Sequence, residues 1–129
     1  MKLSAPPAGT QPLDIKLHQR SRVLEISFDD GSCFSLPCEY LRVFTQSAEA
    51  VGHAEGQEIL QVGKEDVNIS SIKPVGQYGI APSFTDGHNS GIYTWDLLYY
   101  LGKNYDTLWA AYLAALQQAG HHRKDITQN

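Results

Sequence analysis

Residues 14–31 read DIKLHQRSRVLEISFDDG, two alternating runs that end in a turn. Apolar side chains occupy every second position: Ile15 and Leu17 in the first run, then Leu24, Ile26 and Phe28 in the second. A period of two with β-branched and aromatic residues is typical of half-buried antiparallel strands. Asp29-Asp30-Gly31 then predicts a tight turn, because glycine tolerates the positive φ of hairpin loops. We expect a returning strand over 33–36.

The same order of strand, turn, strand and helix recurs later in the chain. Phe28-x-Asp30-Gly31 is followed by Phe34-Ser35-Leu36 and Tyr40-Leu41, and Phe84-x-Asp86-Gly87 is followed by Tyr93-Thr94-Trp95 and Leu97-Leu98. This similarity has two interpretations: two copies of one supersecondary unit that pack face to face, or a chance likeness over few positions.

The segment between the two copies is less regular. Residues 45–66 are poor in large apolar groups and are expected to form a long surface loop. A strand is expected over 67–72, and Pro74 to Gly76 is expected to turn the chain. The next strand is then expected to place four side chains on one face: Tyr78, Ile80, Pro82 and Phe84.

Helices are expected after each copy. A short one follows Pro37, and two longer ones close the chain. Thr94 is expected to cap the first of these and Gly102 to end it. The last helix has an apolar stripe at helical spacing: Leu108, Trp109, Tyr112, Leu113 and Leu116. Tyr99 and Tyr100 are adjacent, so one of them is expected to face outward as part of a partner surface.

These patterns predict an α+β fold, with antiparallel β-hairpins, a short central helix and two C-terminal helices. A chain of 129 residues has the size of one domain. We expect this domain over 13–120, with a flexible leader over 1–12 and a frayed tail over 121–129. A net charge of −4 argues against a general nucleic-acid binder, and no apolar run is long enough to cross a membrane.

The N-terminus lacks the apolar segment of a secretory signal, so the cytoplasm is the expected compartment. Cys33 and Cys38 are the only cysteines, and a cytoplasmic domain of this size needs no disulfide.

A longer series of motifs extends beyond the two turns. Its central part is Phe84-x-Asp86-Gly87-His88-x-Ser90-Gly91-Ile92-Tyr93-x-Trp95. In chain order the others are Phe28-Asp29-Asp30-Gly31, Leu36-Pro37-x-Glu39-Tyr40-Leu41-Arg42, Ser47-Ala48-Glu49, Pro74-Val75-Gly76-x-Tyr78 and Trp109-x-x-Tyr112. From Asp14 to Gly120 the series resembles the γ-butyrobetaine hydroxylase-like N-terminal domain family, long catalogued as the domain of unknown function DUF971.

In this family the domain precedes the iron/2-oxoglutarate catalytic domain of γ-butyrobetaine and trimethyllysine hydroxylases. It also accompanies some iron–sulfur cluster carrier ATPases and occurs alone in bacteria. The resemblance thus implies a fold and an accessory role in docking or dimer formation, and it implies no activity.

The resemblance also concerns a structural zinc site, which the hydroxylases build from three cysteines and one histidine. His88 matches the histidine, whereas the cysteine positions fall on Thr45, Ser47 and Ala50. Hydroxyls and a methyl group cannot replace thiolates around zinc, so this site is predicted to be absent.

An alternative metal site consists of Cys33, Cys38 and His88, which could hold zinc or iron in a metal-handling or iron–sulfur-related protein. The cysteine spacing matches no recognised metal knuckle, and free cysteine is commonly a small buried hydrophobe. His53-Ala54-Glu55 has the spacing of a facial triad, but iron oxygenases need a larger jelly roll. We therefore do not expect an oxygenase.

The candidate binding residues are His88, Asp86, Arg42 and Tyr93, on a surface that would include residues 45–56. Two of them also have structural interpretations, because aspartates cap turns and the His88 ring could fix the neighbouring loop. No nucleophile elbow or phosphate-binding loop occurs in the sequence. The leading hypothesis is a non-enzymatic interaction module without a cofactor, which works through a protein partner or self-association, without nucleic acid or membrane.

Overall fold

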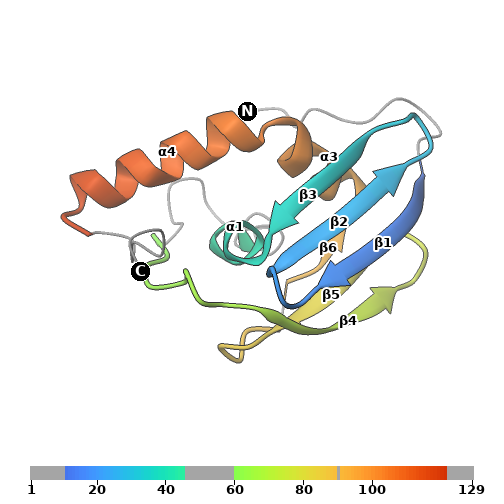
Figure 1. The fold of residues 1–129 in the computed structure, drawn as a ribbon, viewed down its shortest axis with the longest axis horizontal. Coiled ribbons are helices and arrows are strands. Elements are labelled where there is room, and N and C mark those ends of the chain that lie inside the picture. Colours follow the sequence, from blue (N-terminus) through green and yellow to red (C-terminus); the bar gives the residue numbers. More distant parts are fainter. Residues whose placement is uncertain (1–10, 46–59, 90, 122–129) are drawn as a thin grey trace.

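The computed structural model describes residues 11–45, 60–89 and 91–121, and these form two small antiparallel sheets and three helices (Figure 1). The first sheet has the order β1-β2-β3, with β1 at Pro12–His18, β2 at Val23–Phe28 and β3 at Cys33–Pro37. The second has the order β4-β5-β6, at Ile69–Val75, Gly79–Phe84 and Tyr93–Thr94. The helices are α1 at Cys38–Val43, α3 at Trp95–Lys103 and α4 at Tyr105–Gln118. The α+β class is confirmed.

The second sheet repeats the first in strand order, and its first two strands also repeat the first sheet in length and register. Strands β1 and β4 each have seven residues, and β2 and β5 each have six. The register shifts at the same place in both outer pairs, between Pro12 and Asp14 in one sheet and between Ile69 and Ser71 in the other. A helix follows each sheet. The predicted repeat of strand, turn, strand and helix is therefore confirmed.

The turns after β2 and β5 have the same backbone conformation. The N–H groups of Phe28 and Phe84 each donate to a carbonyl across the turn, at 2.8 and 2.9 Å. Gly31 and Gly87 have φ angles of 91° and 93°, which an L side chain rarely adopts. Glycine is thus required at the same point of both copies.

The inner faces of the two sheets meet in one core, which α1 and α3 complete (Figure 1). Strands β2 and β5 alternate as predicted, so that their inward side chains are buried. The main buried residues are Leu24, Ile26, Phe28 and Leu36 from the first sheet, Ile69, Ile80, Phe84 and Tyr93 from the second, and Tyr40, Leu41, Leu97, Leu98 and Leu101 from the helices.

Two expectations about the second sheet are wrong. Pro74, expected to begin a turn, lies within β4 opposite Ile80. Strand β4 is at the edge of its sheet, where proline is tolerated because an outward N–H needs no partner strand. The turn begins at Gly76, whose φ is 53°. Tyr78, expected in the strand on the same face as Ile80, Pro82 and Phe84, lies in this turn and is 55% exposed.

Helix α3 begins as predicted and ends later than predicted. The Thr94 hydroxyl oxygen accepts a hydrogen bond from the Leu97 N–H at 3.1 Å, which confirms the cap. Gly102 does not end the helix, which continues to Lys103. A Cβ at Gly102 would lie 2.4 Å from Cγ of Phe34, so this glycine instead allows α3 to approach β3 closely.

The expectation that Tyr99 or Tyr100 faces outward is also wrong, since both are buried. Helix α3 packs over a wide face, so neighbouring positions can both be covered. The Tyr99 ring contacts Phe28 and Phe34 edge to face, with ring centroids 5.1 and 5.5 Å apart. No outward aromatic patch forms at this pair.

The predicted stripe on α4 is partly confirmed. Tyr112 and Leu116 are buried, and Leu108 and Trp109 are half-buried. Leu113 is exposed, so its assignment to the packed face is wrong. No helix in the described part of the chain is long and apolar enough to cross a membrane.

The expected leader and tail fall almost wholly on residues 1–10 and 122–129, outside the described residues. Pro12, which was expected in the leader, begins β1.

We expect Gly102→Ala to lower the free energy of unfolding by about 1–3 kcal/mol, because the methyl group would overpack the Phe34 ring. At an uncrowded helix position the same change would raise stability by about 1 kcal/mol, so the sign of the effect tests the contact. Urea unfolding measures it. The double variant Phe34→Leu/Gly102→Ala is the control and should lose less than the two single losses combined. A stabilised Gly102→Ala would contradict the contact.

Candidate functional site

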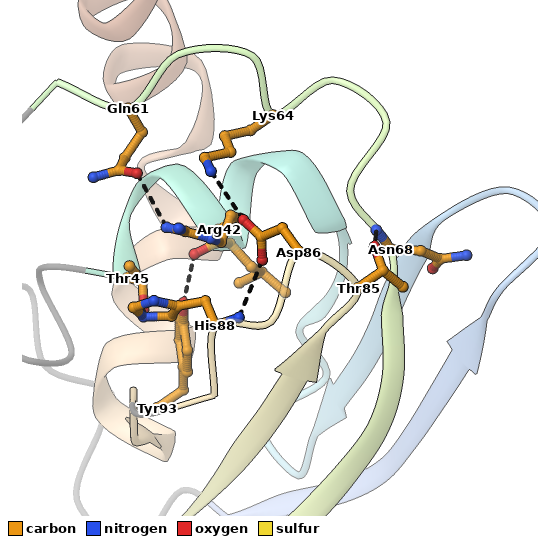
Figure 2. A network of polar contacts seen from close by, with 10 residues as sticks. Arg42, Thr45, Gln61, Lys64, Asn68, Thr85, Asp86, His88 and Tyr93 are labelled. Atoms are coloured by element: carbon orange, nitrogen blue, oxygen red, sulfur yellow. Dashed lines mark hydrogen bonds and ion pairs between the residues drawn. The ribbon is translucent and has the colours of Figure 1, made fainter.

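The structure brings the four candidate binding residues together where α1 meets the turn after β5 (Figure 2). Arg42 lies in the last turn of α1, and Tyr93 begins β6. Asp86 and His88 belong to the connection between β5 and β6. Three of these residues, Arg42, Asp86 and His88, thus form one polar cluster although they are distant in the sequence.

Asp86 is the centre of this cluster. Its Oδ2 accepts hydrogen bonds from Arg42 Nε and Lys64 Nζ, each at 2.9 Å, and its Oδ1 accepts one from the His88 N–H at 3.3 Å. Partial burial raises the pKa of Asp86, but the hydrogen bonds from Lys64, His88 and Arg42 outweigh this effect and hold the pKa at about 2. The carboxylate is therefore ionised at neutral pH.

Arg42 is only 7% exposed, although it carries a charge. Its Nε pairs with Asp86, and its Nη1 donates to the side-chain oxygen of Gln61 at 3.2 Å. A buried guanidinium needs such partners because an unpaired buried charge is strongly destabilising. Sequence reasoning missed Lys64 and Gln61, whose segment carries no regular pattern.

His88 faces the end of α1 through its ring. Its Nε2 lies 3.1 Å from Oγ1 of Thr45, within hydrogen-bonding distance. The resemblance assigned the zinc-ligand positions to these two residues and to Ser47 and Ala50. The structure thus confirms that Thr45 and His88 are neighbours, while Ser47 and Ala50 lie outside the described residues.

Tyr93 is completely buried, so its side chain is not on the surface. Its hydroxyl donates to the carbonyl oxygen of Leu41 and ties β6 to α1 (Figure 2). The Tyr40 hydroxyl makes a second such bond, from α1 to α3, by donating to the Leu101 carbonyl at 2.6 Å. Burial raises the pKa of Tyr40, which keeps this hydroxyl neutral.

The first turn has a matching cluster, which sequence reasoning also missed. Asp30 Oδ1 accepts a hydrogen bond from the Ser32 N–H at 2.9 Å, and its Oδ2 accepts one from the Tyr99 hydroxyl at 2.6 Å. These hydrogen bonds, that of Tyr99 first, lower the pKa of Asp30. The helix after the second sheet thus holds the turn of the first sheet, and Arg42 of α1 holds the turn of the second.

The alternative metal ligands do not converge. Cys33 begins β3 and Cys38 follows its end, which separates them by roughly 16 Å at the usual rise of a strand. Cys33 is exposed, and its Sγ lies 3.8 Å from a Glu25 carboxylate oxygen. Cys38 is buried, with Sγ 3.7 Å from Oδ1 of Asn68, and burial raises its thiol pKa.

Within residues 11–45, 60–89 and 91–121, no group of three or more His, Cys, Asp or Glu side chains could hold a metal ion. His53 and Glu55 lie outside these ranges.

A second candidate site is an apolar groove between the edge strands β1 and β4. Its volume is about 470 Å³. It is lined by Ile15 and Leu17 of β1, Ile72 and Pro74 of β4, Ile80 of β5 and Trp95 of α3. Sequence reasoning placed several of these residues on inward faces but missed that the sheets leave this groove open.

Comparisons with known proteins agree with this architecture. Residues 15–99 match the family model described as gamma-butyrobetaine hydroxylase-like, N-terminal. Two solved structures, each described as an NMR solution structure, are 44% and 45% identical to the chain with a TM-score of 0.77 each. They cover 93% and 88% of this chain, and 90% of each of their own chains is matched.

A crystal structure of a protein of unknown function from Acidithiobacillus ferrooxidans, of the DUF971 family, is 38% identical with a TM-score of 0.59. The match covers 71% of this chain and 92% of that one. No curated protein matches the chain.

We expect Asp86→Asn to lower the free energy of unfolding at neutral pH by about 1–2 kcal/mol. The Asp86 pKa is about 2 in the folded protein against an ordinary value of 3.8, so the carboxylate contributes its stability above about pH 4. That contribution is lost as the pH falls from 4 towards 2. Urea unfolding across this range should therefore show the wild-type and variant curves converging in acid.

Asp30→Asn is the matched control, because Asp30 occupies the same place in the first turn but bonds a neutral tyrosine. Salt should reduce the effect of Asp86→Asn, which removes ion pairs, more than that of Asp30→Asn. A wild-type–variant difference at position 86 that is the same at pH 2 and pH 7 would contradict the assignment.

Proposed function

The chain belongs to the gamma-butyrobetaine hydroxylase-like N-terminal domain family, and we propose that it is a non-catalytic protein-interaction module of the cytoplasm. The family match supplies the fold and no activity, since function depends on sites. The proposal therefore rests on what the two candidate sites offer chemically.

The polar cluster around Asp86 supports a structural role. Arg42 is buried and bonded to Asp86 and Gln61, and the Thr45–His88 contact joins the end of α1 to the turn. Such groups act on each other and fix the shape of the surface around them. This arrangement suits a scaffold better than a reaction centre, where side chains must be positioned towards a substrate.

The single observation that carries the proposal is the apolar groove between β1 and β4. Trp95 lies at this groove, and tryptophan is prominent among residues that dominate binding energy. Both walls are edge strands. A protein segment placed there could bury apolar side chains and form main-chain hydrogen bonds with an edge, as in binding by strand addition.

We expect Ile72→Glu to abolish association by placing a charge in the groove, whether the partner is another protein or a second copy. Ile92→Glu is the matched control, because Ile92 is 39% exposed and does not line the groove. Sedimentation of the purified domain and affinity capture with each immobilised variant measure association. Binding that both variants retain, or association absent from the wild type in both assays, would contradict the proposal.

The metal-handling alternative makes a different prediction. We expect Cys38→Ser to leave the zinc and iron content of tag-free protein unchanged, because the buried Cys38 thiol contacts the Asn68 amide and lies far from Cys33. Elemental analysis measures this content, with Cys33→Ser as the comparison. Stoichiometric metal that is lost in Cys38→Ser would instead support the alternative.

A further inference from the structure

We propose that a second copy of this chain covers the groove. The β1 strands of the two copies would pair antiparallel, about a two-fold axis at Ile15. The inference rests on the proposed function and specifies the partner at the same site. It follows from the position, charge pattern and apolar residues of β1.

Strand β1 is the outer strand of its sheet and pairs only with β2 in the described chain. Beyond its end, the Gln19 side chain donates to the Ile69 carbonyl at 3.0 Å, and the Asn68 side chain donates to the Gln19 carbonyl at 2.8 Å. These contacts join the two sheets at one end of the groove. Along the rest of β1 the described chain places no strand against the outer edge, and such an edge is a template for another chain.

The sequence of β1 is complementary to itself in one register. Antiparallel pairing centred on Ile15 places Asp14 of each copy opposite Lys16 of the other, twice per dimer. Within one copy these two side chains form an ion pair, with Lys16 Nζ 3.5 Å from Asp14 Oδ2, and they are well exposed, at 60% and 54%, so each can also contact a second copy. Opposite charges in cross-strand positions are favourable and like charges are unfavourable.

Two neighbouring registers also keep side chains of the same face opposite one another, but they bring like charges together. Pairing centred on Asp14 would oppose the two Asp14 carboxylates, and pairing centred on Lys16 would oppose the two ammonium groups. A shift by a single residue would put Ile15 opposite Lys16 and mix the inner and outer faces. Charge and burial therefore select the same register.

The apolar side chains of β1 also favour the register centred on Ile15. Leu13, the most exposed large apolar residue of those described, lies at the irregularity between Pro12 and Asp14 and would come near Leu17 of the other copy, which lines the groove. The two Ile15 side chains would meet at the axis, next to both grooves. The dimer would thus cover apolar surface that a single copy exposes.

The equivalent edge strand β4 lacks this complementarity. Pro74 removes one backbone donor from its edge, and Lys73 has serine residues rather than a carboxylate on its N-terminal side, at Ser70 and Ser71. Lys73 occupies the place in β4 that Lys16 has in β1. This difference between matching strands provides an internal control.

The test is sedimentation equilibrium of the full chain over a range of concentrations. We expect a concentration-dependent dimer, and we expect Asp14→Lys and Lys16→Asp each to raise its dissociation constant about tenfold or more, because each places like charges opposite one another twice. Mixing the two variants should restore association, because one strand is then basic and the other acidic. Lys73→Asp, the matched control on β4, should dimerise like the wild type.

Circular dichroism and urea unfolding establish that the exposed substitutions leave each variant folded. A wild type that stays monomeric, or dimers that Asp14→Lys and Lys16→Asp leave unchanged, would overturn the β1 pairing. A monomer whose capture of a different protein is lost in Ile72→Glu would overturn this inference while leaving the interaction module intact. Failure to recover dimers on mixing would overturn the register.

Discussion

Each half of this domain is held by an aspartate in its turn that accepts a hydrogen bond from the helix of the other half. Asp86 in the second turn accepts from Arg42 of α1, and Asp30 in the first turn accepts from Tyr99 of α3. Two buried tyrosine hydroxyls add ties between the halves, from Tyr40 and Tyr93. Small sheets of few strands need such packing partners for stability. Because the bonds cross between the copies, neither half can open its turn without losing contact with the other.

The two crossing bonds differ in their electrostatics, and this difference explains why one end of the domain looks like a site. Asp30 meets a neutral hydroxyl, whereas Asp86 meets two cations and lies beside the Thr45–His88 contact. The resemblance places zinc ligands at Thr45 and His88, so the metal of the hydroxylases would join the same helix end to the same turn. In this chain a hydrogen bond makes that connection. The motif residues are thus explained by holding α1 on the second turn.

Local patterns in the sequence predicted most of the fold. Alternation identified the inward faces of β2 and β5, the two Asp-Gly pairs identified the turns, and Thr94 identified the start of α3. The errors occur where distant residues decide. By sequence Gly102 resembles a helix stop, but in the structure it allows Phe34 to pack closely against α3. Tyr99 is buried by Phe28 of β2 and Phe34 of β3. The convergence of Arg42, Asp86 and His88 could be predicted from a family motif, but Lys64 and the groove depend on three-dimensional placement alone.

The groove is also where the internal repeat becomes unequal. Strands β1 and β4 match in length and register shift, yet β4 carries Pro74, while β1 carries two opposite charges that complement each other across a two-fold axis. Core positions of both copies must satisfy the same packing, which keeps the halves alike. An edge strand is free of that constraint and can be either protected or used for pairing. A proline at one edge and a self-complementary sequence at the other fit a domain that associates through β1 alone.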